Sequence, residues 1–201
     1  MKKLIASDLM TLEQYARERP AFRARIMDHK KNRQLAVGPN CTWLFEDRLT
    51  IQYQVQEMLR AERIFEAGGI AEELEAYNPL IPDGSNWKVT LLIEYPDPGE
   101  RRDALARLRG FEKRCWVQID GHERLFAIAD EDLERETDEK TSSVHFLRFE
   151  LDHAMRRALL GGAKFGIGID HEHYRHAIGH VPDEVRVALL ADLDAPASVR
   201  H

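Results

Sequence analysis

The stretch from Arg48 to Glu66 constrains the fold most, because it contains neither glycine nor proline and is rich in strong helix formers. Its opening letters, TIQYQVQE, alternate apolar and polar residues as a half-buried strand does. Five apolar residues nevertheless recur at helical spacing and form one stripe: Ile51, Val55, Met58, Leu59 and Phe65. Asp47 before the stretch is a good N-cap, and Gly68-Gly69 after it can end a helix. We therefore predict one continuous helix over residues 48–66.

The other N-terminal residues also predict helices, with one hairpin among them. Thr11 and Gln14 form a capping box that begins a helix, and Pro20 either kinks this helix or begins a second one. The letters QLAV, GPN and CTWLF predict two short strands joined by a turn. A short helix follows at residues 70–77. We interpret residues 1–80 as a mainly helical part that ends at the turn-rich letters NPLIPDGSN.

The second half alternates strands and helices. Strands are predicted near residues 87–95, 114–119, 123–129, 144–150 and 163–169. Helices follow the N-caps Asp97 and Asp152, and a last helix begins near Pro182 and ends near Leu193. This order predicts an α+β class in which residues 81–201 form a mixed sheet of about five strands, with a ferredoxin-like split βαβ as one such arrangement. We expect the two parts to pack as one compact unit.

Charge and cysteine content argue against several classes of protein. The net charge is −6 and the Lys and Arg residues are spread along the chain, whereas a nucleic-acid binder gathers a basic face. No apolar run approaches the length of a membrane span, and the apolar stretch near the N-terminus is too short for a signal peptide. Cys41 and Cys115 stand alone, which argues against a disulfide framework, a structural zinc site and a cysteine-ligated iron–sulfur centre. We therefore expect a cytoplasmic protein that binds neither nucleic acid nor membranes.

The predicted long helix carries the first candidate site. Tyr53, Gln56, Glu57 and Arg60 share one face of it, with Gln52 beside them. An acid, a guanidinium and neutral hydrogen-bonding groups on one face suit a small polar ligand or general acid–base chemistry. The alternative is an intrahelical Glu57–Arg60 pair with the glutamines facing water. We prefer a polar interface between the two halves of the chain.

The turn-rich segment supplies a second candidate site. Asp83, Ser85 and Asn86, together with backbone N–H groups, are of the types that bind an anion or contact the glutamine-rich helix. A tight turn explains the same letters.

A histidine-rich segment supplies a third candidate site. The letters DHEHYRHAIGH bring His171, His173, His176 and His180 close together in the sequence, and Asp170 or Glu172 could complete a site. Neutral imidazoles bind zinc, iron, nickel and copper, so a transition metal is the cofactor to consider, and we predict no other. A solvated loop is the alternative. By contrast, His145 is expected to be a hydrogen-bonded histidine within a strand, and Trp43, Trp87 and Trp116 to be packing residues.

Three segments carry a resemblance to a known family: TIQYQVQEMLRAERI, YNPLIPDGSN and EKTSSVHFLRFEL. With SDLMTLEQYARERPAFRARIMDHK and the pattern formed by Asp170, His171 and Tyr174, the chain resembles, over nearly its whole length, a bacterial family catalogued as domain of unknown function 3501. That family has no established activity. The resemblance implies redox partners, namely rubrerythrin-like proteins and iron–sulfur oxidoreductases, in a peroxide-defence or electron-transfer module. It carries over His171 and Tyr174 but not the other histidines.

Two functions therefore stay open. The first is a non-catalytic accessory or ligand-binding component of a redox module, acting through protein contacts. The second is an enzyme or metalloprotein that uses the face around Glu57 and Arg60 or the segment from His171 to His180. The sequence contains neither a G-x-x-x-x-G-K-[ST] phosphate loop nor a G-x-S-x-G elbow, which counts against two common enzyme classes. It leaves the oligomeric state open.

Overall fold

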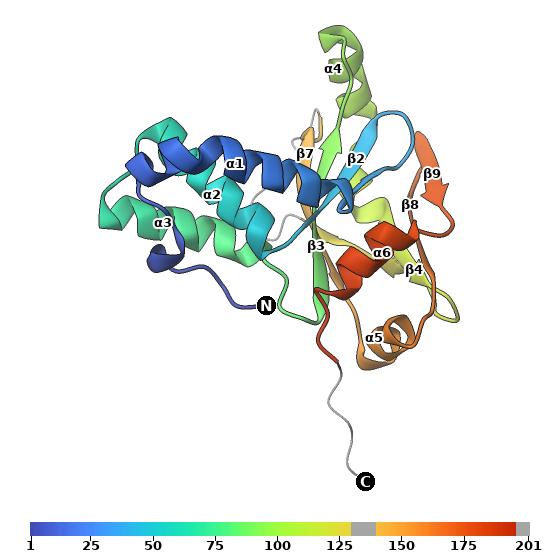
Figure 1. Cartoon of the computed structure of the whole chain (residues 1–201). Coiled ribbons are helices and arrows are strands. Elements are labelled where there is room, and N and C mark those ends of the chain that lie inside the picture. The colour runs from blue at the N-terminus through green and yellow to red at the C-terminus, as the bar shows by residue number, and fades with distance from the viewer. Residues whose placement is uncertain (130–139, 196–201) are drawn as a thin grey trace.

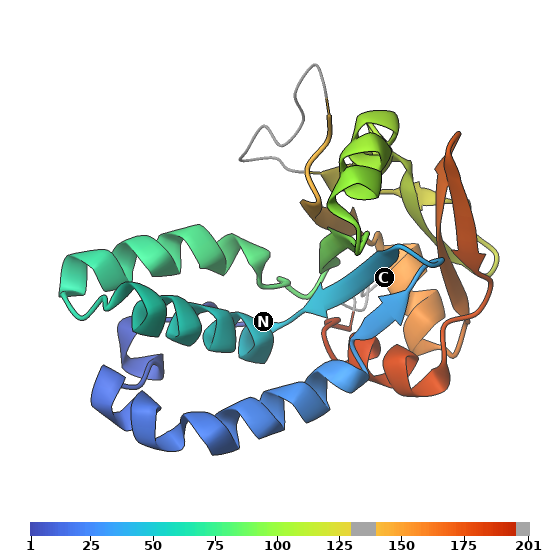
Figure 2. The same cartoon turned by 90° about the horizontal axis from the view of Figure 1, so that it is seen from above.

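A computed structural model describes residues 1–129 and 140–195 of the chain. Three helices form an arm that projects from one side of the molecule (Figures 1 and 2). These helices are α1 (Leu12–Lys31), α2 (Arg48–Glu62) and α3 (Ala67–Tyr77). We call them the helical arm, and we call the rest of the described residues, which contain two sheets and three further helices, the body. The further helices are α4 (Pro98–Arg107), α5 (His153–Leu160) and α6 (Asp183–Leu190).

Helix α1 begins with the capping box that the sequence predicts. The Thr11 hydroxyl accepts a hydrogen bond from the Gln14 backbone at 3.2 Å, and the Gln14 side chain accepts one from the Thr11 backbone at 3.1 Å. The helix continues through Pro20 to Lys31, so no second helix begins at this proline. Its buried residues, Tyr15, Phe22 and Ile26, form a small apolar cluster with Tyr53 of α2.

Helix α2 is shorter than the sequence predicts. Asp47 is its N-cap, as expected, but the helix ends at Glu62, where Arg63 adopts a left-handed conformation with φ 56°. The glycine pair therefore does not end α2, and the prediction of one helix over residues 48–66 is wrong at its C-terminus. Both glycines lie in the first turn of α3 instead, and a Cβ at Gly69 would lie 2.7 Å from the Ile64 side chain. Gly69 thus allows the α2–α3 connection to pack closely.

The first sheet is antiparallel and has the strand order β1-β2-β3-β7-β6. Its strands are β1 (Gln34–Ala36), β2 (Cys41–Glu46), β3 (Asn86–Ile93), β7 (Val144–Glu150) and β6 (Ile128–Ala129). The predicted hairpin over β1 and β2 is present, and β2 pairs along its whole length with β3. The arm is therefore connected to the body on both sides of this hairpin, through the end of α1 and the start of α2.

The second sheet is also antiparallel and has the strand order β5-β4-β8-β9. Its strands are β5 (Leu125–Phe126), β4 (Cys115–Ile119), β8 (Phe165–His171) and β9 (Tyr174–Ile178). Short 3-10 helices connect other elements: η1 (Ala6–Asp8), η2 (Asn78–Leu80) and η3 (Phe111–Arg114).

The α+β class is thus confirmed, but the expectation of a single mixed sheet is wrong. Both edges of β3 are already paired, with β2 on one side and β7 on the other. Strands β4 and β8 consequently pair with each other in a separate sheet, and a ferredoxin-like arrangement, which needs one sheet, does not form.

The two sheets share one hydrophobic core. Trp43 stacks on Phe149 within the first sheet, with ring centroids 5.5 Å apart, and Trp87 contacts Phe165 of the second sheet at 4.8 Å. The indole N–H of Trp87 donates to the backbone carbonyl of Leu189 in α6 at 3.0 Å, which positions that helix over the core. In the described part of the chain, no helix is both long and apolar enough to cross a membrane.

Candidate functional site

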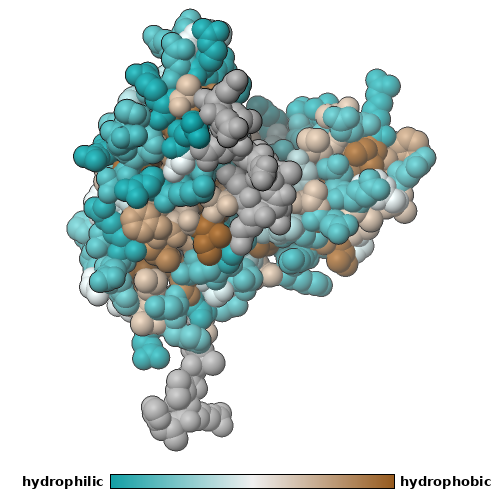
Figure 3. Space-filling view, turned by 180° about the vertical axis from the view of Figure 1, so that it is seen from behind, coloured by the Kyte–Doolittle hydropathy of each residue, from teal (hydrophilic) through white to brown (hydrophobic). Residues whose placement is uncertain are grey.

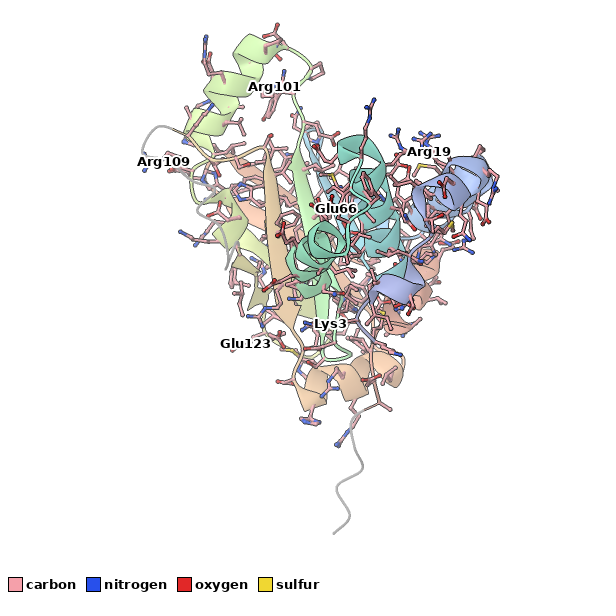
Figure 4. All side chains as sticks on the ribbon, turned by 90° about the vertical axis from the view of Figure 1, so that its left-hand side faces the viewer. Lys3, Arg19, Glu66, Arg101, Arg109 and Glu123 are labelled. Atoms are coloured by element: carbon pink, nitrogen blue, oxygen red, sulfur yellow. The ribbon has the colours of Figure 1, made fainter. Side chains whose placement is uncertain are left out.

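The Glu57 carboxylate lies between the first two helices of the arm and has three partners. The Tyr15 hydroxyl donates to its Oε1 at 2.7 Å, and Arg19 donates from Nε to Oε1 at 2.7 Å and from Nη2 to Oε2 at 2.9 Å. Tyr15 and Arg19 are four residues apart on α1, so both side chains face α2 (Figure 4 labels Arg19). Arg60, one turn along α2, lies farther away at 3.4 Å.

These contacts fix the protonation states of the group. The Arg19 guanidinium lowers the pKa of Glu57 to about 2, helped by the hydrogen bonds from Tyr15 and Arg60 and opposed by partial burial. Burial and the hydrogen bond to Glu57 raise the pKa of Tyr15 well above its usual value. A carboxylate that stays ionised and a phenol that stays protonated are both poorly matched to proton transfer near neutral pH. The arrangement therefore favours a structural role over acid–base chemistry.

The glutamines of the same helix hold the N-terminal segment. Gln56 is fully buried; its Oε1 accepts from the Met10 backbone N–H at 2.6 Å and its Nε2 donates to the Met10 carbonyl at 3.3 Å. Gln52 donates to the Asp8 carbonyl at 2.6 Å. Tyr53 is buried against Phe22, with the rings 6.0 Å apart. In the part of the chain that the structure describes, the polar face that the sequence suggests thus makes its hydrogen bonds to α1 and residues 8–10, which belong to the same half of the chain.

The turn-rich segment makes its hydrogen bonds within itself and to the neighbouring strand β7. The Asp83 carboxylate accepts from both the backbone N–H and the hydroxyl of Ser85 at 2.8 Å, and Asn86 donates to Glu150 at 3.0 Å. Gly84 has φ 100°, and a Cβ there would lie 2.1 Å from the Asp194 carboxylate, so only glycine fits. This geometry is that of an Asx turn whose polar groups already have partners.

The four histidines of the C-terminal segment do not converge. His171 is buried and its Nε2 lies 3.0 Å from the Arg109 carbonyl, while His173 is half-exposed beside it. His176 packs on the Tyr174 ring, and His180 lies 3.7 Å from Asp120. Among residues 1–129 and 140–195, no three His, Cys, Asp or Glu side chains are grouped so that they could hold a metal ion.

Tyr174 instead connects the edges of the two sheets. Its hydroxyl donates to the Val37 carbonyl at 2.8 Å and accepts from the Asn40 N–H at 3.0 Å, so β9 holds the turn of the β1–β2 hairpin. Gly38 in that turn has φ 79°, and a Cβ there would lie 2.6 Å from both Tyr174 and His176. His145 is a fully buried strand histidine, as expected, and its Nε2 lies 2.9 Å from the Thr141 hydroxyl.

A buried charge cluster at the junction of arm and body has no counterpart in the sequence predictions. Arg33, directly after α1, makes a two-point contact with Asp192 at 2.8 and 2.7 Å. Its Nε also lies 3.1 Å from Asp47, the N-cap of α2, and His29 lies 2.6 Å from the same carboxylate. Arg33 and Asp192 are separated by 159 residues, so no local spacing could have paired them.

Comparison with known proteins adds a family and a structural relative. The family model described as "Protein of unknown function (DUF3501)" matches residues 3–193. A crystal structure described as a novel protein of unknown function from Burkholderia pseudomallei K96243 is 50% identical in sequence and superposes with a TM-score of 0.91. The match covers 96% of this chain and 100% of that one. No curated protein matches this chain.

Proposed function

This chain belongs to the DUF3501 family, and from that premise we propose that it is a non-catalytic accessory component of a redox or oxidative-stress module, which binds a partner protein through the helical arm. The observation that carries the proposal is an apolar groove at the end of the arm. The rubrerythrin-like and iron–sulfur proteins that the family resemblance implies are the partner class we propose.

The groove has the size and the apolar lining of a site that binds one face of a helix. It encloses about 520 Å³ between the start of α1 and the α2–α3 connection. Six apolar residues make up most of its lining: Leu9, Leu12, Leu59, Ile64, Phe65 and Ile70. Figure 3 shows hydrophobic side chains at the surface of the arm, which lies at the right of that view. Grooves of this kind bind the apolar face of an amphipathic helix.

Phe65 is the exposed part of this lining. Its relative exposure is 72%, the largest among the exposed large hydrophobic residues of the described chain. An exposed side chain of this size contributes favourable binding free energy when a partner buries its apolar surface. Among the described residues that line the groove, Glu13 is the charged one, so its side of the groove carries negative charge. We therefore propose an amphipathic partner helix with Lys or Arg beside its apolar face.

The groups that could have supported catalysis in the arm already serve its assembly. Glu57, Tyr15 and Arg19 bind one another, and Gln56 holds the Met10 backbone. These contacts keep residues 8–10 and the start of α1 in place, and both line the groove. The polar face of α2 thus holds in place the N-terminal residues 8–10, which help to form the groove.

Titration calorimetry tests the proposal with defined partners. The purified protein is mixed with a purified rubrerythrin-like protein and, separately, an iron–sulfur oxidoreductase from the same host. We expect Phe65→Ser to weaken binding about tenfold or more, as expected for a buried aromatic hot spot. Val187→Ser is the matched control, because Val187 is 64% exposed on α6 of the body.

Two results would contradict the proposal. One is the absence of binding to both redox proteins. The other is a wild-type dimer, detected by light scattering, that Phe65→Ser converts to a monomer, because the groove would then be occupied by a second copy of this chain.

A further inference from the structure

The outer face of the second sheet carries a positively charged site that the arm does not involve. Strand pairing places Trp116 opposite Gly168, and Gly168 opposite Ala177, so these three positions share that face. Asp170 lies opposite Arg175 on the same face. Beside Trp116 the middle of this surface therefore has only glycine and alanine, and charged side chains lie at one end (the sheet of β4, β8 and β9 in Figure 1).

The Trp116 ring packs directly on the backbone of Gly168, which has no side chain. A Cβ at Gly168 would be 2.4 Å from Cζ2 of the indole, so the ring needs a glycine beneath it. The Arg124 guanidinium lies over the ring, 4.1 Å from its centroid. Stacking of a guanidinium on an indole holds the charge in a defined place while leaving its N–H groups for other partners.

Three arginines gather around one acidic residue at this end. Arg124 lies 3.6 Å and Arg175 3.4 Å from the Asp170 carboxylate, both longer than an optimal charged hydrogen bond. Arg114 donates to the backbone carbonyl of Asp170 at 2.9 Å and leaves the carboxylate to the other two. The two arginines that line the cavity therefore exceed the Asp170 carboxylate by one positive charge.

A cavity of about 210 Å³ opens among these side chains. Its lining includes Trp116, Arg124, Asp170, Arg175 and His176. A second concavity, of about 300 Å³, is lined by Trp116, Gln118, Asp120 and three glycines. Trp116 therefore borders both concavities.

We propose that this cavity binds the phosphate group of a small phosphorylated molecule between Arg124 and Arg175. A phosphate monoester carries about −1.5 to −2 charges at pH 7, so it can pair with both guanidinium groups, as the Asp170 carboxylate does. Guanidinium groups donate paired hydrogen bonds to phosphate oxygens, and two of them on different elements define a specific position. The remainder of the ligand extends past the stacked Arg124 and Trp116 side chains toward Gln118.

Nuclear magnetic resonance with inorganic phosphate as the probe tests the site. The Trp116 indole N–H signal is identified with Trp116→Phe and followed as phosphate is added at constant ionic strength, with chloride as the reference anion. We expect a saturable shift for phosphate. Arg175→Ala should weaken binding about tenfold, the effect of losing a hydrogen bond to a charged group. Asp170→Asn should strengthen binding, because it removes the competing carboxylate.

Arg23→Ala is the matched control, since it removes an exposed arginine of α1 far along the chain from the cavity. Melting curves of all variants are recorded first, and the comparison uses those that remain folded. The proposal is wrong if phosphate gives no saturable shift at Trp116, if Arg23→Ala weakens binding as much as Arg175→Ala does, or if Asp170→Asn weakens it.

Discussion

The guanidinium of Arg33 binds the Asp192 carboxylate through both terminal nitrogens, at 2.8 and 2.7 Å, with only 4% and 3% of the two side chains exposed. This pair connects the chain between α1 and β1 to the residues that follow α6. Arg33 also donates to the Ala188 carbonyl at 3.1 Å. The arm is therefore attached to the body by a buried ionic contact in addition to the peptide chain.

Breaking this pair should be strongly destabilising. Arg33→Met leaves Asp192 buried without its cation, and we expect a loss of about 3–5 kcal/mol in the free energy of unfolding, measured by urea denaturation. Arg23→Met, at an exposed position of α1, should cost well under 1 kcal/mol. Arg33→Met combined with Asp192→Leu should recover part of the loss, because no uncompensated charge remains. Additive losses in the double variant would show that the two side chains are not coupled.

Glu57 should give the stability a defined dependence on pH. Its pKa is about 2 in the folded protein, below the ordinary value of 4.5, because Arg19 and Tyr15 bind the ionised form. The stabilisation is therefore complete above pH 4.5 and is lost as the pH falls from there toward 2. Since the pair is partly open to solvent, we expect about 1–2 kcal/mol.

Urea midpoints recorded between pH 2 and 6 provide the measurement. Glu57→Gln should make the profile flatter over that interval, whereas Glu62→Gln, at an exposed position of the same helix, should leave it unchanged. Parallel profiles for the wild type and Glu57→Gln would contradict the assignment.

Arg19 and Arg60 should contribute very differently, although both contact Glu57. Arg19 makes two hydrogen bonds of 2.7 and 2.9 Å from another helix, while Arg60 is 45% exposed and lies 3.4 Å away on the same helix. We expect Arg19→Ala to be clearly more destabilising than Arg60→Ala, because a two-point contact between helices is lost, whereas Arg60→Ala removes a pair within one helix and should cost about 0.3–0.5 kcal/mol or less. Thermal melts of the two single variants and of each combined with Glu57→Gln measure the coupling. A larger coupling for Arg60 would reverse the assignment of partners.

Gly168 should tolerate no side chain. Its added methyl group would lie 2.4 Å from the Trp116 ring and 2.9 Å from the His176 carbonyl, so Gly168→Ala should destabilise by about 1–3 kcal/mol. Gly179→Ala is the control, since nothing lies within 4 Å of a Cβ there, and this substitution should be neutral or slightly stabilising. Near-ultraviolet circular dichroism should show a changed tryptophan signal for Gly168→Ala only. Equal melting temperatures for both variants would mean that the indole moves away freely.

Local signals predicted the local structure well. The Thr11 capping box, the Asp47 and Asp152 N-caps and the hairpin around Gly38 each depend on residues that are close in sequence, and each is present. The end of α2 was predicted wrongly because glycine has two uses. Gly69 allows close packing of Ile64, while Arg63 adopts the left-handed conformation that ends α2, a conformation more often found at glycine.

Contacts between distant residues were beyond local reasoning. The face of α2 was recognised as polar, but its main partners, Tyr15 and Arg19, lie about forty residues earlier on a helix whose orientation the sequence does not specify. The same holds for Arg33 and Asp192, and for the partition of the strands into two sheets. Sequence periodicity predicts which side of a helix or strand is buried, but it does not predict which other element packs on that side.

The Arg33–Asp192 contact also sets the order in which the molecule can be completed during synthesis. The ribosome adds Asp192 159 residues after Arg33, which takes roughly 10–30 s at 5–20 residues per second. Once Asp47 has been added, Arg33 has that neighbour but still lacks its two-point partner, so the arm can form its own helices before it is fixed to the body. A nascent chain stalled before α6 would therefore lack the Arg33–Asp192 contact between arm and body. Its Arg33 side chain, without Asp192, would distinguish it from the complete protein.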